Sequence, residues 1–151
     1  MYNLVLDFVE SKIEGFERPE IIFEEEFSYA VKSRNIAVPI DYTCSIEQHH
    51  WWKSFMMKYL MLEYGVFVTE QDDYIFSLLH EIGHYITLED VPPNVVYYNY
   101  DKDMAKVEKA ASTYEYEKAY RQIAIERMAD LWAIDFIETY PEVLELNKIS
   151  L

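Results

Sequence analysis

The sequence contains little glycine, cysteine or basic charge, and each shortage excludes a class of protein. Three glycines among 151 residues leave no glycine-rich loop for phosphate and no dinucleotide-binding fingerprint. The single cysteine, Cys44, excludes an internal disulfide framework. Nothing near Cys44 marks it as an activated nucleophile, so we interpret it as a small core residue.

Acidic residues outnumber basic residues by 28 to 13, which gives a formal net charge of −15. Phosphate contacts need clustered lysine and arginine, so nonspecific nucleic-acid binding is disfavoured. A neutral or basic protein partner is favoured electrostatically. The densest acidic run, Glu24-Glu25-Glu26, is interpreted as solvated surface rather than as a binding site.

Long apolar runs are also absent, since no stretch reaches the ~18 apolar residues of a membrane span. The first residues lack a basic region and include Asp7, so we expect no signal peptide and a cytoplasmic protein without membrane contact. A hydrophobic fraction of 51% with 17% aromatic residues is ample for a core. The length predicts one domain over residues 1–151.

The most informative stretch is His80-Glu81-Ile82-Gly83-His84, an H-E-x-x-H motif. Two histidines four positions apart lie on one face of a helix, so both imidazoles can bind one zinc ion. Glu81 projects to the side, within reach of a metal-bound water, where it can act as a general base. Glycine within a helix costs about 1 kcal/mol relative to alanine, so Gly83 predicts the close approach of another backbone or of the substrate.

The residues around the motif predict a helix with two distinct faces. Thr69 and Asp72 fit a capping box at its start. Apolar residues recur at helical spacing and predict a buried stripe, at Ile75, Leu78, Leu79, Ile82 and Ile86. The neighbouring face is polar and carries both histidines, together with Asp73, Ser77 and Thr87. A metal site between helices needs this division into a packed face and a ligand face.

No histidine follows His84, so a carboxylate is the natural third ligand of a catalytic zinc ion. Glu126 and Asp130 lie four apart in a helical pattern from about residue 114 to residue 140, and they share a face. We predict that Glu126 binds the metal and that Asp130 accepts a hydrogen bond from a ligand histidine, which fixes the tautomer. The alternative is an exposed acidic pair, but the apolar residues around both positions favour a buried helix.

The other elements are predicted in outline. Helices are expected over about residues 4–13 and 45–64, the second with a capping box of Ser45 and Gln48 and an end at Gly65. Alternation over residues 36–42 predicts a strand, with residues 29–31 as its hairpin partner. Pro39 suits an edge, so this strand is expected to border the site. After the prolines at 92–93, one or two helices are expected from about residue 101 to residue 140.

H-E-x-x-H followed by a helix that carries E-x-x-x-D resembles the gluzincin branch of zinc metallopeptidases. The H-E-I-G-H form at 80–84 and the stretch from Tyr120 to Asp130 resemble, more narrowly, the ImmA/IrrE group. Those proteins are compact zincins common in phages and mobile elements, often paired with a transcriptional repressor.

The resemblance implies that His80, His84 and Glu126 are zinc ligands and that Glu81 is the general base. It also implies a mostly helical α+β fold, a minimal zincin with a small antiparallel sheet beside the H-E-x-x-H helix. The spacer from His84 to Glu126, 126 − 84 = 42 residues, is longer than is typical of these proteins and predicts an inserted loop or helix.

The predicted function is a zinc-dependent endopeptidase that hydrolyses a peptide bond in one protein partner, such as a repressor. The alternative is a non-catalytic zincin-fold regulatory protein that acts by binding, and the intact Glu81 argues against it because a structural site has no use for a base. A DNA mimic is a third interpretation, motivated by charge alone. Tyr114, Tyr120, Arg121 and the His49-His50 pair are candidates for stabilising an oxyanion, but a structural role is favoured for each of them.

Overall fold

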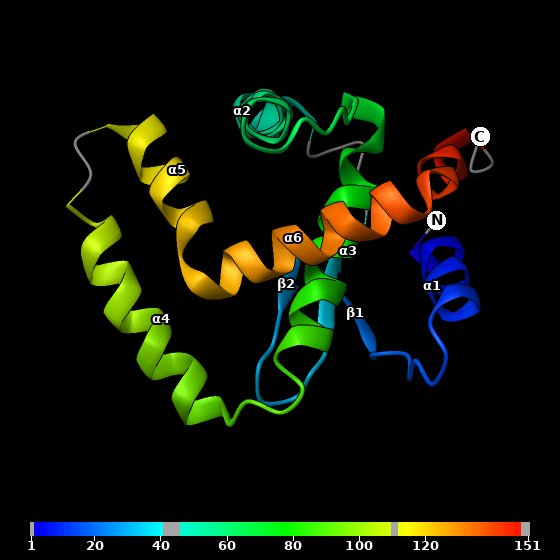
Figure 1. Ribbon diagram of the computed structural model, residues 1–151, viewed down its shortest axis with the longest axis horizontal. Helices are drawn as coiled ribbons and strands as arrows, with labels where there is room; N and C mark the ends of the chain where they lie inside the picture. The colour runs from blue at the N-terminus through cyan, green and yellow to red at the C-terminus, as the bar shows by residue number, and fades with distance from the viewer. Residues whose placement is uncertain (1, 41–45, 110–111, 149–151) are drawn as a thin grey trace.

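Two helices cross at the centre of the structure, α3 (Asp73–Thr87) and α6 (Ala124–Thr139) (Figure 1). The computed structural model describes residues 2–40, 46–109 and 112–148, and it leaves out the side chains of residues 46–53. α3 and α6 form the most extensive contact between any two described elements. Both helices therefore hold their facing side chains in a fixed relation.

A small sheet lies beside α3. Its strands are β1 (Ile21–Glu24), β2 (Ser28–Tyr29) and β3 (Ile36–Pro39), in the order β1-β3-β2. β2 pairs with β3 in antiparallel fashion, as the predicted hairpin requires, whereas β1 pairs with β3 in parallel. The mostly helical α+β class is thus confirmed, and the sheet is mixed rather than purely antiparallel.

The prediction that the strand near residues 36–42 is an edge strand is wrong, although its last residue, Pro39, does line the cavity beside the candidate site. β3 is the central strand, and all four of its residues are buried. Pro39 lies at its end, opposite Glu24 of β1. The edge on the side of the site is β2, which was expected only as a hairpin partner. Residues 41–42 lie outside the described residues.

Local signals place most helix ends. α1 (Tyr2–Lys12) ends before Gly15, and α2 (Ile46–Tyr64) ends at Gly65, whose φ of 68° suits glycine. Thr69 and Asp72 form the predicted capping box, which begins a short 3-10 turn, η2 (Glu70–Asp72), that runs directly into α3. The predicted Ser45–Gln48 cap and Cys44 lie outside the described residues.

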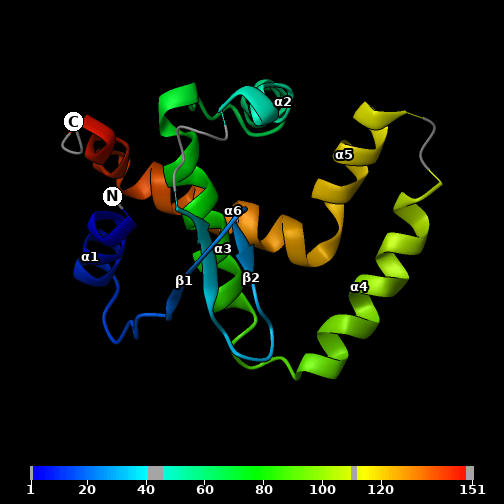
Figure 2. The same cartoon turned by 180° about the vertical axis from the view of Figure 1, so that it is seen from behind.

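The run that was predicted as one helix over residues 114–140 is broken. α5 (Thr113–Gln122) ends at Ile123, whose extended backbone has φ −62° and ψ 147°, and α6 begins at the next residue. The expected insertion is α4 (Pro93–Val107) together with α5. These two helices stand away from the sheet, on the side of β2 rather than of β1 (Figure 2).

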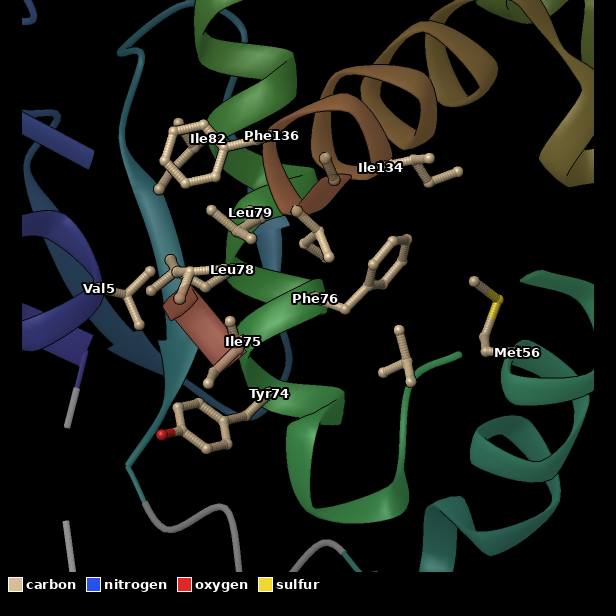
Figure 3. Close-up of a cluster of buried hydrophobic side chains, with 14 of the residues drawn as sticks. Val5, Met56, Tyr74, Ile75, Phe76, Leu78, Leu79, Ile82, Ile134 and Phe136 are labelled. Atoms are coloured by element: carbon tan, nitrogen blue, oxygen red, sulfur yellow. The ribbon is translucent and has the colours of Figure 1, made fainter. Parts of the chain in front are cut away.

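The core gathers on the apolar stripe of α3. Ile75, Leu78, Leu79 and Ile82 are fully buried, as predicted, and Ile86 is partly buried against the same cluster. Side chains from α1, α2 and α6 belong to the same core cluster, including Val5, Met56, Ile134 and Phe136, and Met56 lies on the side of Phe76 (Figure 3). η3 (Pro141–Lys148) follows α6 and closes the core beside α1. Among the described helices, none combines the length and apolarity needed to cross a membrane.

Candidate metal centre

The polar face of α3 brings His80, Glu81 and His84 together. All three side chains are buried, and ligand atoms of the three lie within 4.8 Å of one another. This arrangement is compatible with binding of a metal ion. It follows directly from the spacing of the motif on a regular helix.

Glu126 of α6 lies between the two histidines. His80 Nε2 is 3.0 Å from Glu126 Oε2, and His84 Nε2 is 3.2 Å from Glu126 Oε1. Glu126 occupies the third position of α6, where the helix dipole favours a negative charge. Burial raises the pKa of Glu126, but the hydrogen bonds to His80 and His84 outweigh burial and lower that pKa well below its ordinary value.

Glu81 and Glu126 differ in the hydrogen bonds that their carboxylates make. Glu81 makes no hydrogen bond with a described residue, although its carboxylate lies near both imidazoles. Burial raises the pKa of Glu81, while the adjacent histidines oppose that rise. Distance alone would allow Glu81 as a ligand. The direct contacts with both Nε2 atoms instead favour Glu126 as the third ligand and leave Glu81 free.

Asp130 lies one turn beyond Glu126 and contacts the outer nitrogen of a histidine. Its Oδ1 is 2.8 Å from His80 Nδ1, and the carboxylate is fully buried. The structure thus brings together the atoms of the predicted hydrogen bond. When His80 donates from Nδ1, its Nε2 lone pair faces the centre, which is the orientation a metal ligand needs.

Arg121 completes the cluster, in a role that the sequence did not predict. Its Nε donates to Asp130 Oδ2 at 3.0 Å, and its Nη2 donates to Asp130 Oδ1. Its Nη1 lies 3.7 Å from Glu126 Oε2. The guanidinium is buried and balances the two carboxylates, so it supports the ligands and is not free to stabilise an oxyanion.

The break at Ile123 explains why this contact was missed. Arg121 and Asp130 are nine positions apart, and about 100° per residue would place them on opposite faces of one continuous helix. Because α5 ends at Gln122, Arg121 turns back toward α6. A signal for this contact would have been a helix breaker, but neither glycine nor proline occurs near the break.

His80 is hydrogen-bonded on both sides, through Nδ1 to Asp130 and through Nε2 to Glu126. Burial and the nearby Arg121 charge oppose its protonation, but the hydrogen bonds to Asp130 and Glu126 outweigh them and raise the pKa of His80 to about 10. Arg121 Nη2 also approaches His80 Nδ1 at 3.2 Å, which is a close approach of two donors when Nδ1 carries a proton. A metal ion would have to replace the proton on Nε2.

Gly83 lies where α3 and α6 come closest. A Cβ atom at this position would lie 2.8 Å from the Ala129 carbonyl oxygen and 3.0 Å from the Ala129 Cα. The predicted close approach of another backbone is therefore confirmed. Ala129 itself is fully buried, so both small residues allow the helices to bring their ligands together.

A cavity of about 670 Å³ opens in front of these residues. It is lined from β2, α3, α4, α5 and α6, and four of the five residues predicted for the polar face reach it, namely Asp73, Ser77, His80 and His84. The fifth, Thr87, donates instead to the Gly83 carbonyl oxygen. The cavity gives a second molecule access to Glu81 and to both histidines.

Two tyrosines line the cavity beside the centre. Tyr120 lies beside Glu126, and Tyr100 of α4 lies beside Tyr120. Burial raises the pKa of both phenols. Tyr100 was not singled out from the sequence, because fourteen tyrosines gave no basis for choice. Tyr114 instead packs against Phe55, and the side chains of His49 and His50 lie outside the described residues.

The donor set fits a zinc ion. Two imidazole nitrogens and one carboxylate match the ligands of catalytic zinc sites. His84 Nδ1 is buried without a hydrogen-bond partner among the described residues, whereas its Nε2 points to Glu126.

Comparisons with protein-family models, with curated proteins and with solved structures found no match. The fold and site therefore define a mostly helical α+β protein with a candidate metal centre.

Proposed function

We propose that the protein is a zinc-dependent endopeptidase of the gluzincin type, similar to the ImmA/IrrE group. The observation that carries the proposal is the convergence of His80, His84 and Glu126 at the wall of an open cavity, beside Glu81, which makes no hydrogen bond with a described residue. A structural metal site has no use for a free buried carboxylate or for an open face.

Each residue of the cluster has a distinct task in this proposal. His80, His84 and Glu126 would hold the metal. When bound, zinc polarises the scissile carbonyl and lowers the pKa of water to ~7. Asp130 holds the His80 ring through Nδ1, and Arg121 balances the buried carboxylates so that the ligands keep their places.

Glu81 would supply the acid–base chemistry. Its carboxylate is buried next to both imidazoles and makes no hydrogen bond with a described residue, so it is placed to act as a general base. It would accept a proton from the attacking water and pass it to the leaving amine nitrogen. β2 lines the cavity as an edge strand, where an extended peptide could add through main-chain hydrogen bonds.

A conservative substitution tests the proposal. Glu81→Gln keeps the side-chain shape but removes the proton acceptor, so it should retain the fold and one zinc ion per chain, yet lose hydrolysis by about 10²–10⁴-fold. The matched control is Glu138→Gln on the exposed side of α6. Zinc is measured by elemental analysis, and cleavage by mass spectrometry of a candidate substrate, first of all a protein encoded beside this chain.

The same pair of variants separates the peptidase from a regulatory protein that acts by binding. A peptidase predicts that Glu81→Gln abolishes the effect on the partner while Glu138→Gln preserves it. If Glu81→Gln reproduces every effect of the wild type on that partner, the protein acts by binding and the peptidase proposal fails.

A further inference from the structure

The wall of the cavity carries uncompensated negative charge. Glu25 and Glu26 line it from the turn before β2, and Asp101 lines it from α4. All three are exposed, and none forms a salt bridge with a residue in the described ranges. The one arginine or lysine among the described lining residues is Arg121, which is buried and bonded to Asp130.

The acidic turn also continues outward from the cavity. A second, shallower hollow is lined by Glu24, Glu25, Glu26 and Ser28, and it shares three of these residues with the main cavity. An acidic track therefore leads from the surface to β2. The sequence predicted solvated surface for this run, and its three carboxylates are indeed exposed; two of them, Glu25 and Glu26, also lie at the wall of the cavity.

Aromatic side chains accompany these carboxylates. Phe27 and Tyr29 line the cavity next to the acidic turn, and Tyr97 and Tyr100 line it from α4, one turn or less from Asp101. Aromatic faces attract ammonium and guanidinium groups, and carboxylates attract the same groups by charge. Both kinds of lining side chain thus favour the same occupant, a positively charged one.

We propose that this cavity selects a protein segment with an arginine or lysine side chain close to the bond to be cleaved, held between the Glu25-Glu26 turn and Asp101. The inference rests on the proposed function, because it names the substrate class of the same site. An acidic segment would be repelled at both walls, and the net charge of −15 adds attraction for a basic partner at long range.

Peptide binding tests the charge preference without requiring hydrolysis. The protein is zinc-loaded Glu81→Gln, and the probes are fluorescent nonapeptide pools in which one position is fixed in turn as arginine, lysine, glutamine or glutamate. At the preferred position, we expect basic pools to bind about tenfold or more tightly than the glutamate pools, with the difference falling as salt is added. Equal binding of all pools, or no measurable binding of the basic pools, would overturn the proposal.

A matched pair of charge variants then locates the preference. Glu25→Gln/Glu26→Gln should weaken binding of the basic pools by about 3–20-fold, since exposed ion pairs contribute a few-fold each. Asp135→Asn/Glu138→Gln removes the same charge from exposed positions on α6 that do not line the cavity, and it should change binding by less than about twofold. Equal losses in both double variants would show a general field effect and would refute a site at the turn.

Cleavage of a peptide library by the zinc-loaded wild type separates this inference from the proposed function. Cleaved bonds flanked by arginine or lysine support both, and the Glu25→Gln/Glu26→Gln variant should then raise KM with little change in kcat, because neither carboxylate touches the reacting atoms. Cleavage without enrichment of basic residues would refute the inference alone. Absence of cleavage would refute the proposed function, and the binding measurement would still decide the charge preference.

Discussion

Gly83→Ala is the sharpest test of how α3 and α6 position the candidate metal centre. The added methyl group would lie 2.8 Å from the Ala129 carbonyl oxygen and 3.3 Å from its carbonyl carbon. These atoms belong to the backbone of α6, so no rotation of a side chain can relieve the contact. The two helices must move apart by a few tenths of an ångström or more.

Two opposing effects set the change in stability. Replacing a glycine within a helix by alanine favours the helix by about 1 kcal/mol. Overpacking a buried contact typically costs about 1–3 kcal/mol, and a contact with a rigid backbone belongs to the upper part of that range. We therefore expect a net loss of about 1–2 kcal/mol, which lowers Tm by about 2–8 °C in a chain of this length.

Zinc affinity should fall more clearly than stability. The histidines lie on α3 and Glu126 on α6, and a metal site tolerates displacements of only about 0.5 Å. We expect affinity for zinc to fall about tenfold or more, measured by competition with a chelator. Thermal unfolding of the metal-free protein gives the stability.

The second variant Ala129→Gly sharpens the test. It removes a side chain but not the backbone atoms that the new methyl group would meet, so it should not rescue Gly83→Ala. The reasoning is refuted if Gly83→Ala is more stable than the wild type with unchanged zinc affinity, because the helices would then not be in fixed contact.

Two further predictions follow from the buried charges. Asp130→Asn should weaken zinc binding by about 10–100-fold, and it should destabilise the fold because buried Arg121 would keep only one of its two carboxylate partners, Glu126. Unchanged zinc affinity in chelator competition would show that Asp130 does not support the ligands. In the metal-free protein, the pKa of His80 is raised, so protonated His80 stabilises the folded state below pH 6.5. This stabilisation is lost as the pH rises toward about 10. The pKa values of Glu126 and Asp130 are lowered, so their ionised carboxylates stabilise the folded state above about pH 4.5. This stabilisation is lost as the pH falls below that value. Denaturant midpoints should therefore peak between pH 4.5 and 6.5; a peak above pH 8 would contradict these assignments.

The local half of the site follows from the sequence alone. His80 and His84 share a face because four residues make about one helical turn, and Glu126 and Asp130 share a face for the same reason. The capping box at Thr69 and the helix end at Gly65 are equally local, since each depends on hydrogen bonds or a φ value within a few residues. Periodicity also placed the buried stripe of α3.

The tertiary structure decided which faces meet and which groups join them. β1 pairs in parallel with β3 across a connection that no local pattern specifies, so the sequence did not reveal that β3 is central and β2 is the edge. The break at Ile123 has no glycine or proline to announce it, and it is this break that allows Arg121 to reach Asp130.

The walls of the cavity depend on the same long-range packing. α4 lies in a spacer whose length predicted only an inserted element, yet its position brings Tyr100 and Asp101 to the wall of the cavity. Whether Glu25 and Glu26 are plain solvated surface or part of that wall depends on what lies across from them. Helical spacing and caps are set by neighbours in the chain, whereas the partners of a carboxylate are set by contacts between distant segments, which only the folded chain brings together.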